Sequence, residues 1–233
     1  ALSLFVVIYV SAQIDITGKT FESFLGFNYY TGIAIGFGIV VLYIFSGGFL
    51  AVAWSDFFQG SLMAVGLLLL PLVAYFSLSD SVSIVEGLNS IDPGLLDIWG
   101  SGGLTLMNAL SILGLVSIGI GFMGSPQVYV RFIAIESEAE VDKGKWVAVW
   151  YTLLTDTAAV LIGIIGRYML TQFGDNPEAI LGNAAENVLA LVLDQVMPTI
   201  IIGVYIAAVL SAVMSTVDSL LVVASSAVTR DFY

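Results

Sequence analysis

A run of oxygen-bearing side chains interrupts an apolar segment near the end of the sequence. The stretch SAVMSTVDSLLVVASS, Ser211 to Ser226, mixes serines, a threonine and an aspartate with residues that suit hydrocarbon. At about 100° per residue, most of these polar residues share a helical face about 120° wide. The face comprises Ser211, Ser215, Asp218, Ser219, Val222, Ser225 and Ser226, with Thr216 at its margin. A carboxylate deep in a membrane helix costs about 2.5–3.5 kcal/mol on insertion scales, so Asp218 must face protein, water or a cation.

This face has two interpretations. Small residues four apart allow helices to pack closely in lipid, and serine hydroxyls can bond back to the carbonyl four residues earlier. Such a packing seam has no need of a carboxylate. Hydroxyls, a carboxylate and nearby carbonyls together offer several hard oxygens, which suit a small hard cation such as Na⁺. Asp218 therefore favours an ion site over a packing seam.

Two further acids lie in or beside apolar runs. Asp56, in AVAWSDFFQGSLM, is predicted to begin a helix on the cytoplasmic side, at a depth similar to that of Asp218. Alternatively, Asp56 caps that helix beside Ser55. Asp156, in YTLLTDTAAVL, is nearer to mid-membrane. It is predicted to pair with a polar partner, relay a proton or line water, and these alternatives stay open.

A second motif predicts a broken helix. The stretch SIGIGFMGSPQVYVRF contains Gly119, Gly121, Gly124 and Pro126. Proline removes a backbone hydrogen bond and clashes with the preceding turn, so closely spaced glycines before it predict a weakened or unwound point. In transporters, unwound helices free backbone groups that hold substrate at mid-membrane. A simple kink is the alternative.

The elements that must position these residues are membrane-spanning helices. Of 233 residues, 59% are hydrophobic and 10% charged, and the mean hydropathy is +1.03, which indicates an integral membrane protein. Runs of about 20 apolar residues can cross the hydrocarbon core, and these are too long for barrel strands. The predicted spans are Tyr29–Gly48, Phe57–Leu78, Leu104–Met123, Trp146–Leu170 and Thr199–Val228, with Ala1–Ile14 as a truncated first helix.

Composition excludes several classes of protein. The chain has no cysteine and no histidine, so it offers no disulfide, no thiolate metal site and no imidazole base. Its net charge of −12 argues against nucleic acid as a partner. An intramembrane enzyme is disfavoured because the buried acids lack a recognisable catalytic pairing.

The distribution of basic residues predicts the topology. Arg131, Lys143, Lys145 and Arg230 fall in connections on one side, which the positive-inside rule places in the cytoplasm. The predicted cytoplasmic connections are the turn at Gly47–Gly48, Arg131–Lys145 and Thr229–Tyr233. The predicted outer connections are Asp15–Asn28, Ser79–Gly103 and Thr171–Pro198. The acidic outer segments include Asp80. The stretch NPEAILGNAAENVLALVLDQVMP is too polar to span and is predicted to be an outer lid or a plain connector.

Three blocks carry a resemblance to a known family. SAVMSTVDSLLVVASSAVTRDFY, GFMGSPQVYVRFIA and FSGGFLAVAWSDFFQGSLM resemble characteristic blocks of the sodium/solute symporter family, in its order and spacing across residues 1–233. The resemblance implies an all-α integral membrane protein with the inverted-repeat, leucine-transporter-type fold. It implies one transmembrane domain that covers core helices three to eight, about six transmembrane helices with a broken sixth core helix. Core helices one, two, nine and ten would be the missing parts of the same chain.

The resemblance also implies site residues. The sodium site of this fold uses one carbonyl and two hydroxyls of the eighth core helix, which match Ala212, Ser215 and Thr216. A second sodium site in some members would match Asp56, Ser215, Asp218 and Ser219. Substrate contact or gating is expected from Ser117, Gly119, Phe122 and Pro126. Proline-type members carry tryptophan and tyrosine where this chain has Ile118 and Phe122, which puts proline as the solute in doubt.

The expected function is sodium-coupled symport of a small organic solute by alternating access, in the cell (plasma or inner) membrane. Na⁺ is the expected coupling ion, with no organic cofactor, and the lipid bilayer is the expected surrounding. One alternative is a proton-coupled carrier on the same fold, with Asp56, Asp156 or Asp218 as the proton site. Another is the symporter-like membrane module of a sensor kinase.

Overall fold

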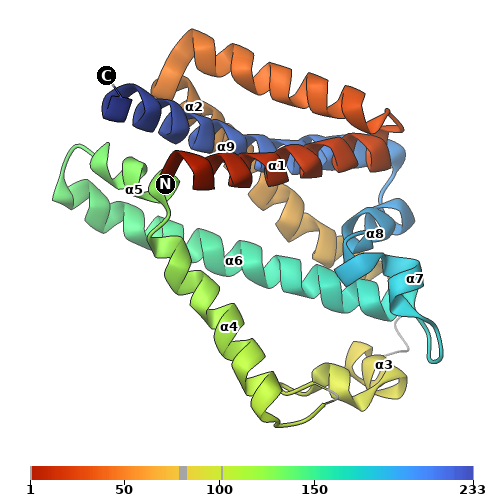
Figure 1. Ribbon diagram of the computed structural model, residues 1–233. Helices are drawn as coiled ribbons and strands as arrows, with labels where there is room; N and C mark the ends of the chain where they lie inside the picture. The colour runs from red at the N-terminus through yellow and green to blue at the C-terminus, as the bar shows by residue number, and fades with distance from the viewer. Residues whose placement is uncertain (1, 79–82, 101, 233) are drawn as a thin grey trace. The chain divides into compact units, whose positions relative to one another are not determined.

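The computed structural model describes residues 2–78, 83–100 and 102–232 and is largely helical across them (Figure 1). In chain order the elements are α1 (Leu2–Leu25), α2 (Tyr29–Ser77), α3 (Ile84–Ile91), the 3₁₀ turn η1 (Pro93–Leu96), α4 (Leu106–Met123), α5 (Pro126–Ile133), α6 (Glu138–Leu170), α7 (Pro177–Leu181), the 3₁₀ turn η2 (Asn183–Ala185), α8 (Val188–Val196) and α9 (Thr199–Phe232). Asp80, expected in an outer segment, lies outside the described residues.

The described residues contain five helical stretches long and apolar enough to cross a membrane. One of them, α2, has 49 residues, which is more than twice the length that one crossing needs. It therefore accounts for two of the predicted spans. This confirms an all-helical membrane protein with about six predicted crossings.

Gly48 divides α2 into two helical segments. Its φ of 54° and ψ of −146° lie in a region that side chains with a Cβ rarely adopt, and the residues on both sides are helical. The turn predicted at Gly47–Gly48 is therefore present. Asp56 lies eight residues beyond Gly48, inside the second helical segment. The prediction that Asp56 begins this helix and the alternative that it caps the helix are therefore both wrong, because the helix resumes directly after Gly48.

The first helix is longer than expected. A loop is predicted over Asp15–Asn28, but α1 continues to Leu25. Its polar residues are satisfied within the helix: Thr17 and Thr20 donate their hydroxyl protons to the carbonyls four residues earlier. Both threonines are buried, so the helix continues because this face packs against protein.

The predicted break in the glycine-rich helix is present but narrower than the motif suggested. Gly119 and Gly121 remain helical within α4, which ends at Met123. The break comprises Gly124 and Ser125, and Pro126 begins α5, where its missing N–H costs nothing. The unwound point therefore lies at the proline end of the motif.

By its contacts the chain forms two units: the first comprises residues 1–66 and 200–233, and the second residues 67–199. In the first unit, glycines let α1 and α2 approach closely. A Cβ on Gly32 would lie 2.5 Å from Phe21 Cβ, and one on Gly36 would lie 2.4 Å from Thr17 Cγ2. The last helix joins α2 through Tyr205, whose hydroxyl donates to the Gly66 carbonyl at 2.8 Å.

In the second unit, α3, α7 and α8 pack against α6. Val192 and Leu193 of α8 are fully buried, and Ile162 and Ile165 of α6 are nearly so. The polar stretch Asn176–Pro198, expected to be a lid or a connector, thus forms short helices held against α6.

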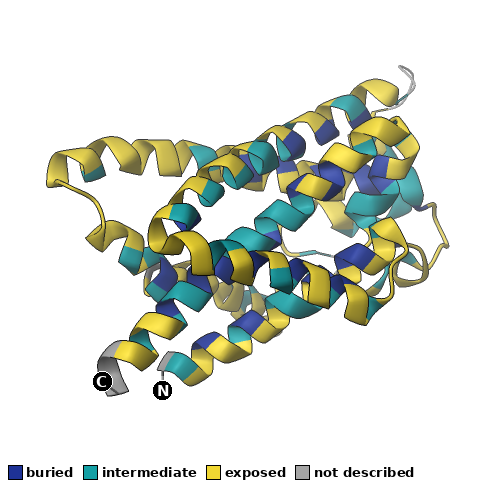
Figure 2. Cartoon of the chain, turned by 90° about the horizontal axis from the view of Figure 1, so that it is seen from above, coloured by how far each residue is buried: buried dark blue, intermediate teal, exposed yellow. Residues whose placement is uncertain are grey.

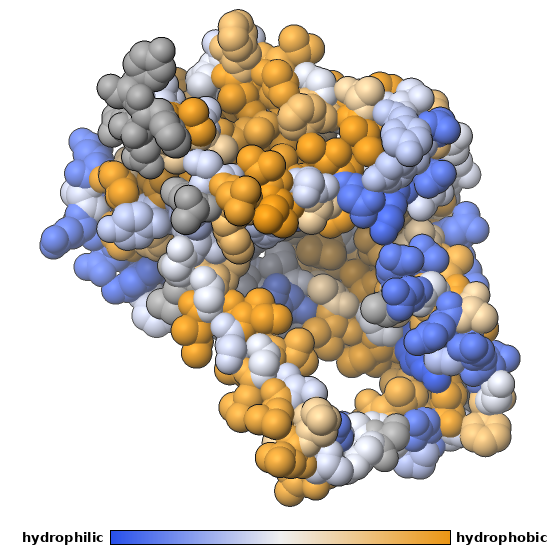
Figure 3. Space-filling view, in the orientation of Figure 1, coloured by the Kyte–Doolittle hydropathy of each residue, from blue (hydrophilic) through white to orange (hydrophobic). Residues whose placement is uncertain are grey.

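Large apolar side chains remain exposed on the helices, and Figure 3 shows them across much of the visible surface. On α4 the exposed fractions reach 78% at Leu106 and 69% at Ile120. Exposed apolar faces of this extent suit lipid or neighbouring membrane helices rather than water.

Candidate ion-binding site

The polar face of α9 is buried around Asp218. The four residues Val217, Asp218, Ser219 and Leu220 are all buried, and Asp218 is 0% exposed. Because four consecutive residues point in all directions around a helix, α9 is enclosed on every side at this level. Figure 2 shows buried residues through the middle of the helix that ends at the C-terminus. Ser225 and Ser226, further along the same face, are exposed.

Three hydroxyls approach the Asp218 carboxylate. Tyr43 donates its phenolic proton to Oδ2 at 2.6 Å. Ser55 Oγ lies 3.2 Å from the same oxygen, and Ser219 Oγ lies 3.2 Å from Oδ1. Tyr43 and Ser55 belong to the two halves of α2, on either side of Gly48. One carboxylate therefore connects both halves of α2 to α9.

These three donors are not equivalent, because each hydroxyl has only one proton to give. Ser55 Oγ lies closer to the Val52 carbonyl, at 2.9 Å, than to Asp218. Ser219 Oγ lies closer to the Ser215 carbonyl, also at 2.9 Å. In the described part of the chain, the Tyr43 proton has Asp218 as its single acceptor. Tyr43 is thus the donor committed to this carboxylate.

Asp56 and Gln59 border the same cluster. The charge of Asp56 acts on both Asp218 and Tyr43, which places the two carboxylates near each other. Asp56 Oδ1 and Gln59 Oε1 are both shielded from solvent. Two nearby acids repel one another when both are ionised, so this arrangement favours a cation or a proton between them.

The oxygens expected to bind the first sodium ion lie together one turn earlier on α9. Ser215 Oγ is 3.0 Å and Thr216 Oγ1 is 3.3 Å from the Ala212 carbonyl oxygen. Oxygens about 2.3–2.6 Å from a hard cation, at about a right angle, are separated by about 3.3–3.7 Å. The Ser215 distance is slightly shorter than this range and the Thr216 distance lies at its lower end. Both hydroxyls keep lone pairs while they donate. Both hydroxyl oxygens therefore lie beside the same carbonyl oxygen.

The remaining predicted residues belong to the second unit. Ser117 donates its hydroxyl proton to the Leu113 carbonyl at 2.7 Å, and Phe122 is exposed. A Cβ added to Gly119 would meet open space, and Pro126 begins α5. Asp156 is exposed on α6. Among the described residues of this unit, these side chains line no enclosed polar site.

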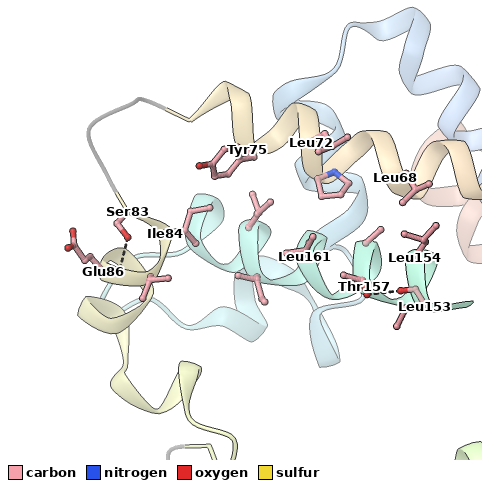
Figure 4. Close-up of a pocket in the computed structure, with 15 residues that line it drawn as sticks. Leu68, Leu72, Tyr75, Ser83, Ile84, Glu86, Leu153, Leu154, Thr157 and Leu161 are labelled. Carbon is pink, nitrogen blue, oxygen red and sulfur yellow. Dashed lines mark hydrogen bonds between the residues drawn. The ribbon is translucent and has the colours of Figure 1, made fainter. Parts of the chain in front are cut away.

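An apolar groove of about 1180 Å³ lies within the second unit. Figure 4 shows Leu68, Leu72 and Tyr75 of α2 on one side of it and Leu154 and Leu161 of α6 on the other. At one end Ser83 accepts a hydrogen bond from the Glu86 backbone. The lining offers too few oxygens to surround a cation, so the groove is a weaker candidate for a cation site than the cluster at Asp218.

Sequence reasoning missed several polar neighbours. It did not include Tyr43 or Gln59, and it considered Ser55 only beside a helix cap. Apart from this cluster, it also missed Gln127 of the second unit, which is 6% exposed and whose Oε1 has no hydrogen-bond partner among the described residues. A usable signal existed for Tyr43 and Ser55: they lie five residues before and seven after Gly48, so a tight turn there brings them to similar depth.

The long apolar helices and the buried polar cluster define a multi-pass membrane protein with a polar site inside its helices. Comparison with known proteins identifies the family: the sodium:solute symporter family matches residues 1–233. The chain therefore belongs to the sodium:solute symporter family, and it is a multi-pass protein of the plasma membrane.

Curated relatives are transporters. The chain is 36% identical to the high-affinity proline transporter PutP of Bacillus subtilis (strain 168), over 99% of this chain and 46% of the relative. It is 31% identical to the osmoregulated proline transporter OpuE of the same strain, over 100% of this chain and 45% of the relative. It is also 31% identical to the sodium/proline symporter of Escherichia coli (strain K12), over 99% of this chain and 45% of the relative. The chain thus spans about half the length of these relatives, and no solved structure gives a significant match.

Proposed function

We propose that the chain forms the ion-binding part of a sodium-coupled symporter for a small organic solute. The observation that carries this proposal is the row of half-buried and buried oxygens on α9, from Ala212 to Ser219, with Asp218 at 0% exposure. Membership of the family and the printed name of the Escherichia coli relative support sodium as the coupling ion.

In this proposal the Ala212 carbonyl and the Ser215 and Thr216 hydroxyls bind the first Na⁺. The Ala212 carbonyl already accepts both hydroxyl protons, so one hydroxyl must turn its proton away before this carbonyl can join the ion. The remaining ligands are proposed to come from core helix one, which the resemblance places among the missing parts of the same chain. Binding of the ion would then order two helices that are distant in sequence.

Asp56, Asp218 and Ser219 are proposed to form a second cation site with Ser215. The support is that the Asp56 charge acts on Asp218, and that Ser219 Oγ lies 3.2 Å from Asp218 Oδ1. A cation between the two carboxylates would relieve their repulsion. A proton on one carboxylate would do so as well, and this is why a proton-coupled carrier is the second candidate.

Proline is the first solute to test, because three relatives are named as proline transporters. Ser117, Gly119, Phe122 and Pro126 are the residues proposed to contact or gate the solute, since they flank or lie within the glycine-rich helix. The movement of each Na⁺ down a membrane potential supplies about 2.3 kcal/mol per 100 mV. One ion can therefore drive appreciable accumulation of solute.

The experiment is solute uptake by the full-length protein in proteoliposomes, with Na⁺ varied at fixed pH. Ser215→Ala combined with Thr216→Ala removes two proposed ligands, and we expect the Na⁺ concentration for half-maximal uptake to rise at least about tenfold. Ser225→Ala combined with Thr229→Ala is the matched control, because these two hydroxyls of α9 are exposed.

Two results would count against the proposal. Uptake that is indifferent to Na⁺ in the unmodified protein and in the double variant would remove sodium coupling. Uptake that follows the pH gradient at fixed Na⁺, and that is lost in Asp218→Asn or Asp56→Asn, would establish the proton-coupled carrier instead.

A further inference from the structure

Tyr43 holds one oxygen of the buried carboxylate. It lies in the first half of α2, is half-buried, and donates its proton to Asp218 Oδ2 at 2.6 Å across 175 positions of sequence. This is a short, charge-assisted type of hydrogen bond, which is both stronger and more directional than one between neutral groups. Tyr43 therefore restricts the rotation of the Asp218 side chain.

The other carboxylate oxygen lies beside the hydroxyl of Ser219. Asp218 Oδ1 lies 3.2 Å from Ser219 Oγ, whose own proton is better placed for the Ser215 carbonyl, at 2.9 Å. The Ser219 backbone N–H also contacts this carboxylate. A carboxylate oxygen has lone pairs for more than one partner, so Oδ1 can accept from Ser219 and still contact a cation. The two oxygens of one carboxylate thus have separate environments, one fixed by a phenol and one beside the proposed ligands.

We infer that Tyr43 is a positioning residue for the ion site: by fixing Asp218 Oδ2, it holds Oδ1 toward Ser219. This inference rests on the proposed sodium site. Ser55 shares Oδ2 with Tyr43 but gives its proton mainly to Val52, so Ser55 contributes little to this positioning.

A purely structural role makes a different prediction. If Tyr43 only ties α2 to α9, its loss lowers stability and leaves ion affinity alone. If Tyr43 positions Asp218, its loss lets the carboxylate rotate, and Na⁺ affinity falls while the affinity for solute at saturating Na⁺ does not. A fall in Na⁺ affinity without a fall in solute affinity is therefore the result that a purely structural role does not predict.

The test is Tyr43→Phe in the full-length protein, which removes the donor and keeps the ring. We expect the half-saturating Na⁺ concentration for proline uptake, or for the solute found to be transported, to rise about tenfold. The half-saturating solute concentration at saturating Na⁺ should change less than about twofold. Tyr29→Phe is the matched control, because Tyr29 also donates to a carboxylate, Asp15, at 2.6 Å within the same unit. Ser55→Ala should change the Na⁺ requirement less than about twofold.

A double-mutant cycle completes the test. In an Asp218→Ala background, Tyr43→Phe should have no further effect, since Tyr43 acts through that carboxylate. Na⁺-dependent uptake with an unchanged Na⁺ requirement in Tyr43→Phe, or additive effects of the two changes, overturns this inference alone. A Tyr43→Phe protein that fails to fold while Tyr29→Phe folds overturns it in favour of a structural tie. Wild-type uptake that is indifferent to Na⁺ overturns the proposed function as well.

Discussion

At the scale of single residues, the main feature is a carboxylate placed where lipid would otherwise surround the helix. Asp218 is fully buried, and hydroxyls from three residues approach it. Hydrogen bonds to a charged group contribute about 1.5–3 kcal/mol each at most, and shared protons contribute less. These donors reduce the cost of burying the charge, and a bound cation would reduce it further.

The first prediction concerns the charge of Asp218. Asp218→Asn keeps the size of the side chain and removes the charge, so it should weaken Na⁺ binding about 10- to 100-fold, or about 1.4–2.8 kcal/mol. The measurement is the Na⁺ dependence of uptake by the full-length protein. Asp15→Asn is a suitable control, because Asp15 also accepts a hydrogen bond from a tyrosine but is only half-buried, with its side chain 43% exposed. Equal Na⁺ requirements in both variants would contradict the prediction.

Residue-scale reasoning from sequence found one side of this cluster. Asp218 was predictable because a carboxylate in an apolar helix needs a compensating partner. Tyr43 was not, because tyrosine is common in membrane helices and its acceptor lies 175 positions away. Only the packing of α2 against α9 shows which of the 10 tyrosines in the chain meets the acid.

At the scale of elements, the close packing of α1 and α2 depends on glycine. The 2.4 Å between a Cβ on Gly36 and Thr17 Cγ2 is shorter than any real contact, so the helices must separate or Thr17 must move. Gly38, two residues later on the same helix, has open space around it. Alanine substitutions at Gly36 and Gly38 can therefore be compared as a test and its matched control.

The second prediction follows from this pair. Gly36→Ala should lower the thermal unfolding midpoint of the purified full-length protein, because overpacking costs about 1–3 kcal/mol. Gly38→Ala should leave the midpoint unchanged or raise it, since alanine favours a helix over glycine by about 0.5–1 kcal/mol. If Gly36→Ala is as stable as Gly38→Ala, α1 and α2 do not pack as described.

The positions of the helices were predictable from apolar runs, but their ends were not. The runs identified every long helix in the described ranges, and the glycine–proline motif identified the break before α5. The helix ends differ because polar residues continue a helix when their hydroxyls bond within it, as Thr17 and Thr20 do. Similarly, α6 begins at Glu138 rather than Trp146, because paired charges such as Lys143 and Glu140, 2.7 Å apart, stabilise a polar start of the helix.

At the scale of the whole molecule, the topology remains a prediction, and the absence of cysteine makes it easy to test. The positive-inside rule places the start of α6 in the cytoplasm and the segment around α7 outside. Glu138 is exposed at the first of these places, and the exposed Glu186 lies in the second. Single cysteines introduced at each position would be the only thiols in residues 1–233.

The third prediction is that a membrane-impermeant maleimide labels Glu186→Cys on intact cells and labels Glu138→Cys only after permeabilisation. For each variant, the amount of maleimide bound on intact cells is compared with the amount bound after permeabilisation. The reversed pattern would place Arg131, Lys143 and Lys145 outside and would contradict the predicted topology.

The bond between Tyr43 and Asp218 also bears on how a cell makes this protein. A ribosome that adds about 5–20 residues per second needs about 9–35 s to go from the first residue to the second, since 175 positions separate them. Throughout that interval the phenol has to remain in the bilayer without its native acceptor. The two halves of α2 must therefore insert into the membrane by their own apolar character. An insertase or chaperone would act most usefully after α2 is made and before α9 is made.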